Sequence, residues 1–273
     1  MTELTPDHQR PMPTTFPARA DYIRVAALGD SATFGLGDRH PDGSPRGWIR
    51  LLADAMATDH HVSLCNLAVS GALIRDVRQG QLVAGVQHSP HLASLVVGMN
   101  DLLRSDWDRE RGRRDLLACG ASLARTGALL LTPRFHDHSA VLRLPNYLRR
   151  PLRRRIEELN AIYDEVDDKF GTLRLDLSET PLANHRAYWS LDRMHPSELG
   201  HRYLAHRVAE LLNAEGLSFP LPSLTPDAAG ESRASERRAL LLQCAPWMAR
   251  RVKDLAPWAL RRGLGHLVPQ GAV

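Results

Sequence analysis

The sequence has no long hydrophobic run, and this absence excludes whole classes of protein. No stretch approaches the roughly 18 uninterrupted apolar residues that a membrane-spanning helix requires. The first 20 residues are polar and contain Pro13 and Pro17, but they lack the apolar core of a secretory signal. We therefore expect a soluble protein without a signal peptide.

Cysteine is also scarce. Cys65, Cys119 and Cys244 lie far apart, with no C-x-x-C pair and no His/Cys spacing typical of metal ligands. An odd number of widely spaced cysteines favours reduced thiols, and hence a cytoplasmic location. We expect neither a metal ion nor a cofactor.

The glycine-rich motifs of nucleotide-binding proteins are absent. Gly29, Gly35 and Gly37 lie close together, but the run lacks the Gly-Lys-Ser/Thr ending of a phosphate-binding loop and fails the G-x-G-x-x-G spacing. The residues around Ser31 also fail the G-x-S-x-G pattern of a nucleophile elbow. These absences argue against a nucleotide site and against an elbow-type nucleophile.

Positive charge is concentrated near the C-terminal end. Residues 230–273 contain eight Lys or Arg against three Asp or Glu, an excess larger than the net charge of +4 for the whole chain. The body of the protein is therefore close to neutral. Because neither a broad basic face nor a recognised motif accompanies the charge, nucleic-acid binding is not expected.

Short apolar runs alternate with longer amphipathic stretches through the middle of the chain. The predicted strands are residues 23–28, 62–67, 92–97, 128–131 and 173–177, and the predicted helices are 48–57, 74–86, 108–125 and 151–170. A last helix is expected to begin at Pro196 and to run to about Leu211. This alternation predicts an α/β fold: a doubly wound parallel sheet of about five strands between two layers of helices.

The same pattern divides the chain into one large domain and its flanks. We expect a flexible tail over residues 1–20, a domain over 21–217, a linker over 218–234 and a basic extension over 235–273. A Pro-Trp…Arg-Arg pattern occurs twice in the extension. It predicts either peripheral contact with an anionic membrane or packing on the domain with the arginines outward, and we favour the packing.

Polar residues gather directly after the predicted strands and before the last helix. These segments are residues 29–35, 66–71, 98–101 and 192–196. In a parallel sheet, ligands bind outside the carboxyl ends of the strands, near the point where the strand order reverses. The four segments are therefore the candidates for a functional site.

Together the four segments resemble the SGNH (GDSL-type) hydrolase superfamily, which includes bacterial GDSL-type esterases and is named for a Ser, a Gly, an Asn and a His in four blocks. The matching positions are Ser31, Gly71, Asn100 and His195, with Asp192 three residues before the histidine. The match extends over about residues 22–213. The resemblance implies a flavodoxin-like strand order 2-1-3-4-5, in which the segments with Gly71 and Asn100 flank the one with Ser31.

A serine hydroxyl is a poor nucleophile until a base takes its proton and a third group orients that base. We predict that Ser31 is the nucleophile, that His195 is the base and that Asp192 orients His195. The resemblance implies an oxyanion hole made by the N–H groups of Ser31 and Gly71 and by the amide of Asn100.

Each of these residues alone has a simpler interpretation. A lone Ser31 is more often a helix cap, a lone Gly71 is a turn glycine, and a lone Asn100 belongs to an ordinary turn. The catalytic interpretation depends on all the blocks occurring in order. The neighbouring Asp30 and Asp101 are expected to be structural and to bond nearby loop backbone.

Residues 133–151 follow the fourth predicted strand and show no clear periodicity. The candidate residues for the substrate pocket in this segment are Phe135, His136, Leu142, Leu144 and Tyr147. A surface loop with incidental apolar residues is an equally good interpretation. The arginines of residues 149–155 favour a solvated helix start over an anion site.

Three functions remain open from the sequence. The first is a cytoplasmic serine ester hydrolase that acts through an acyl-enzyme on a small or lipid-like ester. The second is an acyltransferase or carbohydrate O-deacetylase that uses the same residues. The third is a membrane- or partner-binding protein that acts through the basic C-terminal segment. The physiological ester and the oligomeric state are not predicted.

Overall fold

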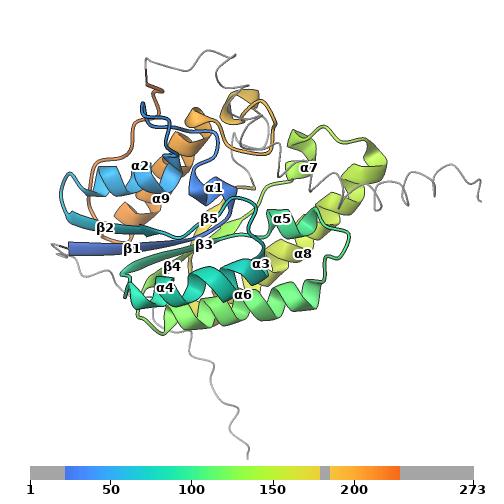
Figure 1. Ribbon diagram of the computed structural model, residues 1–273, viewed down its shortest axis with the longest axis horizontal. Coiled ribbons are helices and arrows are strands. Elements are labelled where there is room, and N and C mark those ends of the chain that lie inside the picture. The colour runs from blue at the N-terminus through green and yellow to red at the C-terminus, as the bar shows by residue number, and fades with distance from the viewer. Residues whose placement is uncertain (1–21, 179–184, 228–273) are drawn as a thin grey trace, which may run out of the picture.

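The computed structural model describes residues 22–178 and 185–227. The predicted N-terminal tail, the end of the predicted linker and the basic C-terminal extension lie outside the described residues. Five parallel strands form one sheet in the order β2-β1-β3-β4-β5, and helices cover both of its faces (Figure 1). The predicted α/β/α fold and strand order are confirmed.

The strands lie close to the predicted apolar runs. They are β1 (Tyr22–Gly29), β2 (His61–Asn66), β3 (Leu92–Val96), β4 (Leu129–Arg134) and β5 (Leu173–Asp176). β1 and β3 lie inside the sheet and are buried almost throughout, which explains their continuous apolar sequences. β4 extends three residues beyond the predicted end at residue 131 and so reaches toward the expected pocket.

Two layers of helices enclose the sheet. α2 (Gly47–Met56) and α9 (Glu198–Ala214) cover one face, and α4 (Leu82–Gln87), α6 (Arg109–Ala124) and α8 (Asn146–Phe170) cover the other (Figure 1). Within the described residues, no helix combines the length and the apolar composition that crossing a membrane requires.

Alternate residues of β1 enter two separate cores. Ile23, Val25 and Ala27 pack with the apolar sides of α2 and α9. Ala26 and Leu28 point the opposite way and pack with those of α6 and α8. Because successive side chains of a strand point to opposite faces, β1 packs against both helical layers.

Short helical turns occupy the connections. They are α1 (Ser31–Phe34), α3 (Ile74–Asp76), η1 (Val77–Gln81), α5 (Met99–Leu102), α7 (His138–Val141) and η3 (Arg186–Tyr188). The single helix predicted over residues 74–86 is interrupted, because η1 is a π-helical turn. Gln81 in this turn exchanges two hydrogen bonds with the backbone of Gly29, at 2.8 and 2.9 Å. The π-helical turn therefore ties this segment to the end of β1.

Two predicted helix starts are wrong. The last helix begins at Glu198 rather than Pro196, because the Ser197 hydroxyl caps it by accepting the N–H of Gly200 at 3.2 Å. Pro196 instead forms a β-bridge with Trp189. The helix predicted from residue 151 begins five residues earlier, at residue 146, and contains that proline within its second turn.

Residues 217–227, which include the start of the predicted linker, pack along α9. Asn213 exchanges two hydrogen bonds with the backbone of Phe219, at 3.1 and 3.2 Å, and the ring of Phe219 is buried. The carbonyl of Ser223 accepts a hydrogen bond from Arg202. This part of the predicted linker therefore adds to the core of the domain.

Tyr163 of α8 holds the end of β3. The side chain is fully buried, and its hydroxyl donates to the carbonyl of Val97 at 2.9 Å and accepts the N–H of Val97 at 3.2 Å. Burial raises the pKa of Tyr163, so the hydroxyl keeps the proton that it donates. Val97 directly precedes the segment that carries Asn100.

Tyr163→Phe removes the hydroxyl that bonds both backbone groups of Val97 in the core. We expect the free energy of unfolding to fall by roughly 1–3 kcal/mol, measured by urea denaturation. The control is Tyr203→Phe on α9, whose ring is partly buried and contacts Tyr188 edge to face. This control is expected to change stability by no more than about 0.5 kcal/mol. Equal losses in the two variants would contradict the role given to Tyr163.

Candidate active site

Ser31 is the first residue of α1 and is separated from the end of β1 by Asp30 alone. The helix cap is Asp30, whose carboxylate accepts the N–H of Ala32 at 3.1 Å. Asp30 therefore bonds loop backbone as predicted, and the simpler interpretation of Ser31 as the cap is wrong. The Ser31 side chain is buried, and its hydroxyl points toward a partner far along the chain.

That partner is His195, which joins Ser31 to Asp192. Nε2 of His195 lies 2.9 Å from Oγ of Ser31, and Nδ1 lies 2.7 Å from Oδ2 of Asp192. Because a carboxylate can only accept, Nδ1 carries the ring proton and the lone pair of Nε2 faces the hydroxyl. In this tautomer the imidazole can take the hydroxyl proton as the oxygen attacks a substrate.

A tight turn brings Asp192 back to the histidine. Oδ1 of Asp192 accepts the N–H groups of Met194 and His195, at 2.9 and 3.2 Å. Arg193, which directly follows Asp192, has a left-handed φ of 59°. Burial acts to raise the pKa of Asp192, but the hydrogen bonds from His195 and the backbone lower it overall. The carboxylate therefore stays ionised and can stabilise a protonated His195.

Asn100 and Gly71 lie on loops beside the serine. The Asn100 amide is buried, and its nitrogen donates to the carbonyl of Ala72 at 3.1 Å and to Oδ2 of Asp30 at 3.3 Å. Ala72 follows Gly71, whose φ of 82° suits a glycine. Both amide hydrogens of Asn100 therefore have acceptors.

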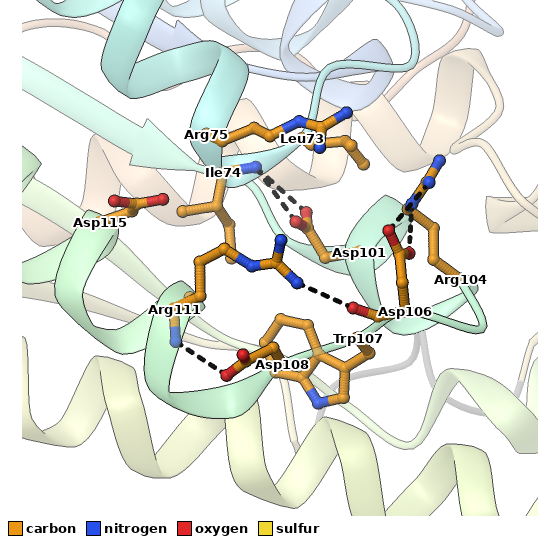
Figure 2. Close-up of a pocket in the computed structure, with 11 residues that line it drawn as sticks. Leu73, Ile74, Arg75, Asp101, Arg104, Asp106, Trp107, Asp108, Arg111 and Asp115 are labelled. Carbon is orange, nitrogen blue, oxygen red and sulfur yellow. Dashed lines mark hydrogen bonds and ion pairs between the residues drawn. The ribbon is translucent and has the colours of Figure 1, made fainter.

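Asp101, beside Asn100, fixes the loop that carries Gly71. Its carboxylate accepts the N–H of Ile74 at 3.1 and 3.4 Å (Figure 2), which agrees with the predicted structural role. The crevice next to it has a volume of about 30 Å³, which leaves room for little more than a water molecule. Arg104 and Asp106 at this crevice pair with each other at 2.7 Å, so their charges are already compensated.

A mostly apolar pocket of about 100 Å³ opens beside Ser31 and His195. Phe135 and His136 line it, as predicted. Other side chains that line it include Trp48, Met99, Leu175, Leu177, Trp189 and Met194. The structure places Leu142 and Leu144 against the core instead, and Tyr147 on the surface. The reason is that their segment, which shows no periodicity in the sequence, folds as α7 and the start of α8.

Two buried histidines form one wall of the pocket. Nε2 of His136 lies 3.1 Å from Nδ1 of His138, and the rings lie 5.2 and 4.7 Å from the ring of Trp189. Burial lowers the pKa of His136 to about 4 and holds that of His138 well below its usual value. Both rings are therefore neutral at pH 7 and contribute an uncharged wall. His138 and Trp189 were missed because their contact joins distant parts of the sequence.

Neither of the two cysteines that the structure describes lines this site. Burial raises the pKa of Cys119 to about 12, so it remains a thiol. Cys65 is also free, and Cys244 lies outside the described residues. Among the residues that the structure covers, no group of three or more His, Cys, Asp or Glu side chains is arranged to hold a metal ion.

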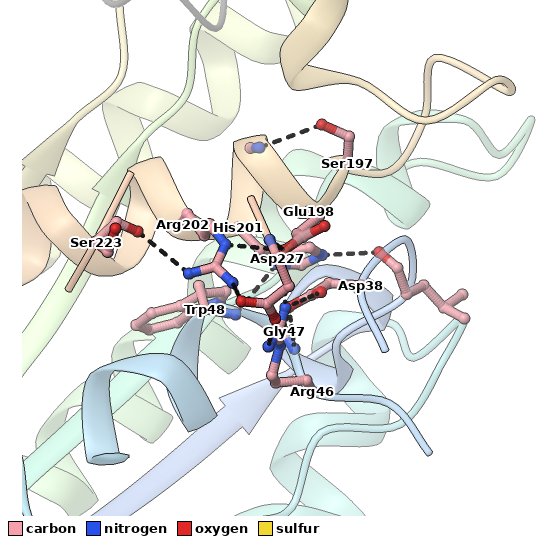
Figure 3. A network of polar contacts seen from close by, with 12 residues as sticks. Asp38, Arg46, Gly47, Trp48, Ser197, Glu198, His201, Arg202, Ser223 and Asp227 are labelled. Carbon is pink, nitrogen blue, oxygen red and sulfur yellow. Dashed lines mark hydrogen bonds and ion pairs between the residues drawn. The ribbon is translucent and has the colours of Figure 1, made fainter. Parts of the chain in front are cut away.

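A network of ion pairs joins the loop after α1 to α9 (Figure 3). Arg46 donates to both oxygens of Asp38, at 2.9 and 2.8 Å, and also contacts Glu198 and Asp227, at 3.2 and 2.7 Å. Arg202 contacts the same two acids, at 2.9 and 2.6 Å. Because Asp38 and Arg46 are largely buried, solvent screens their attraction little.

His201 of α9 crosses to the same loop. It is fully buried, and its Nε2 donates to the carbonyl of Leu36 at 2.8 Å while its Nδ1 accepts the N–H of Trp48 at 3.2 Å. Burial lowers the pKa of His201, so the ring is neutral and each nitrogen has one matching partner. The ring therefore fixes the distance between α9 and the start of α2.

Gly37 allows the loop after α1 to approach the loop that carries His195 closely. Its φ is 98°, and a Cβ built on it would lie 1.9 Å from the carbonyl oxygen of Pro196 and 2.5 Å from Oγ of Ser190. Only glycine allows this contact. Since Pro196 directly follows His195, the position of the histidine depends on this contact.

Known proteins resemble this chain in sequence and in structure. The model of a GDSL-like lipase/acylhydrolase family matches residues 27–203, which is more than half of the chain. The chain belongs to the GDSL-like lipase/acylhydrolase family. This confirms the resemblance that the four segments carry, and membership implies an ester-hydrolysing enzyme.

Individual relatives are distant. The uncharacterized protein YpmR of Bacillus subtilis (strain 168) is 25% identical in an alignment of 227 positions that covers 72% of this chain and 84% of that protein. The esterase EstA from Pseudoalteromonas sp. has a TM-score of 0.56 at 16% identity, covering 70% of this chain and 97% of that one. Axe2, an acetylxylan esterase from Geobacillus stearothermophilus, has a TM-score of 0.57 at 16% identity, covering 75% and 97%. These structural likenesses show a shared fold.

Gly37→Ala should displace the loop that carries His195. We expect kcat for a short ester to fall by about 10²-fold, since a misplacement of about 1 Å at a reacting group has such an effect. The matched control is Gly43→Ala. Gly43 also has a left-handed φ, of 84°, but a Cβ there meets nothing within 4 Å. Similar kcat values in the two variants would contradict the role given to the contact between Gly37 and Pro196.

Proposed function

We propose that this GDSL-like protein is a serine carboxylesterase that acts through an acyl-enzyme on Ser31. The observation that carries the proposal is the position of His195, 2.9 Å from the Ser31 hydroxyl and 2.7 Å from the Asp192 carboxylate. Such an arrangement combines a nucleophile, a base and the group that orients the base. Family membership supports the ester as the bond that is cleaved.

In the first half of the reaction, Oγ of Ser31 attacks the ester carbonyl carbon while Nε2 of His195 takes the hydroxyl proton. The tetrahedral intermediate then expels the alkoxide, which leaves as an alcohol with the proton from His195. In the second half, His195 deprotonates a water molecule that attacks the acyl carbonyl. Ser31 leaves and recovers its proton from His195. Asp192 stabilises the protonated imidazole in both halves.

The negative charge of each tetrahedral intermediate needs hydrogen-bond donors. We assign this role to the backbone N–H groups of Ser31 and Gly71 and to the side-chain amide of Asn100. The assignment is supported by the bond between Asn100 and Ala72, which brings the loop with Gly71 next to the amide. The longer bond from Asn100 to Asp30 is the one that an oxyanion would replace.

The pocket favours an apolar group next to the scissile bond. Aliphatic and aromatic side chains such as Trp48, Leu175 and Leu177 form most of its surface, and the two histidines of its wall are neutral at pH 7. A cavity of about 100 Å³ suits a short acyl chain. We therefore propose short aliphatic esters as the preferred class.

A carbohydrate O-deacetylase is the second candidate function. It is favoured by the fold shared with the acetylxylan esterase Axe2 and by a pocket that also accepts an acetyl group. The two candidates differ in the alcohol that leaves. Faster hydrolysis of acetylated xylooligosaccharides than of alkyl butyrates would favour the deacetylase, and acyl transfer to added alcohols would favour an acyltransferase.

Ser31→Ala and Asp192→Asn should each lower the turnover of p-nitrophenyl butyrate by roughly 10⁴-fold. The first change removes the nucleophile, and the second removes the charge that orients and stabilises the imidazole. The matched control is Ser94→Ala on β3, because this buried hydroxyl has no hydrogen-bond partner among the described residues. Circular dichroism checks the fold of each variant. Undiminished turnover in purified Ser31→Ala would contradict the proposed function.

A further inference from the structure

Three segments that wall the pocket each carry an arginine next to their pocket-lining residues. α7 contributes His138 to the wall, and Arg143 follows shortly after the helix. η3 contains Arg186 and precedes the pocket residue Trp189. The loop with Asp192 contains Arg193, which directly precedes two more pocket residues.

The arginines lie outward from these buried neighbours. His138, Trp189 and His195 are 4%, 7% and 4% exposed, whereas Arg143 and Arg186 are exposed and Arg193 is partly so. The three arginines are therefore more exposed than the pocket residues beside them in the chain.

Hydrogen bonds to backbone carbonyls hold two of the guanidinium groups in place. Arg193 donates from Nη1 to the carbonyl of Val141 at 3.4 Å, so its side chain reaches the end of α7, two residues before Arg143. Arg186 donates from Nη1 to the carbonyl of Trp189. These bonds use only part of the donor set, because a guanidinium has five N–H groups.

None of the three has a carboxylate partner within residues 22–178 and 185–227. The acids on the same segments are engaged elsewhere: Asp137 binds Arg149, and Asp192 binds His195. The pKa of Arg193 is lowered by burial and by the charges of Arg143 and Arg186. Among the described residues, three like charges thus lie near one another without a carboxylate partner, whereas Arg46 and Arg202 are surrounded by acids.

We propose that Arg143, Arg186 and Arg193 form an anion-binding site at the mouth of the pocket, and that it selects esters carrying a carboxylate or phosphate group. The inference rests on the proposed esterase function and names its substrate class. The apolar part of such a substrate enters the pocket, and its charged end remains among the arginines. A guanidinium binds either anion with two parallel hydrogen bonds, and the uncompensated charge also attracts it from solution.

The test compares charged esters with neutral esters of similar size. One pair places the charge on the acyl side: the mono-p-nitrophenyl ester of glutaric acid against p-nitrophenyl valerate. The other places it on the alcohol side: 3-acetoxybenzoate against its methyl ester. The quantity measured is the ratio of kcat/KM between charged and neutral ester, which is independent of the fraction of folded enzyme. The pair with the larger ratio identifies the side of the ester that bears the charge.

We expect a ratio above one in at least one pair for the wild-type enzyme, falling as salt is added. Each of Arg143→Gln, Arg186→Gln and Arg193→Gln should lower this ratio by about two- to fivefold, as expected for exposed charge pairs. Arg193→Lys should restore part of the ratio because it keeps the charge. The matched control is Arg125→Gln, an exposed arginine at the end of α6 and shortly before the amino end of β4, which should leave the ratio unchanged.

Two results would overturn the site: neutral esters preferred in both pairs, or a ratio that the three glutamine variants do not change. These results leave the esterase function standing. If no ester is hydrolysed, the esterase function fails, and a binding measurement then tests the anion-binding site by itself. Calorimetry with the Ser31→Ala variant and monomethyl glutarate should show a dissociation constant that rises about two- to fivefold with each arginine replaced. An unchanged constant would overturn the proposal.

Discussion

The close packing of two loops determines whether this site exists at all. Ser31 belongs to the first strand-to-helix connection, and His195 lies 164 residues later, ahead of the last helix. Their hydrogen bond requires the two connections to meet at a fixed distance. Gly37 makes that approach sterically possible, and the neutral ring of His201 spans the gap with one donor and one acceptor. Arg46, which Asp38 holds on the first connection, pairs with Glu198 and Asp227 and so links the same two regions.

The sheet brings the remaining parts to the same edge. With β1 between β2 and β3, the loops after these neighbouring strands lie on either side of Ser31. Gln81 and Tyr163 then fix the ends of β1 and β3 by bonding the backbone of Gly29 and Val97. Both residues come from the helical layer on the opposite side of the sheet from α9. The site therefore depends on both layers.

Much of this arrangement could be predicted from the sequence. Buried parallel strands have continuous apolar runs, so the strands and the segments that follow them were predictable. The resemblance to the SGNH superfamily implied the strand order, and the blocks with Ser31, Gly71, Asn100, Asp192 and His195 pointed to one site. It was harder to predict which of two neighbouring residues caps a helix. Ser197 caps the last helix, which begins at Glu198 rather than at Pro196, and Asp30 rather than Ser31 caps the first. Contacts between distant segments, such as His138 with Trp189, leave no periodic signal. For the same reason Leu142, Leu144 and Tyr147 could not be placed from the sequence.

The central claim is that His195 activates Ser31 as the nucleophile of an ester-hydrolysing enzyme. Its most direct test is labelling with an alkyl fluorophosphonate, followed by mass spectrometry of the peptides, because this reagent forms a stable bond only with an activated serine. The account predicts a single phosphonyl group on Ser31, loss of esterase activity in step with labelling, and no labelling of the His195→Ala variant. Esterase activity that survives the reagent, or a label on another residue that accounts for its loss, would contradict the claim.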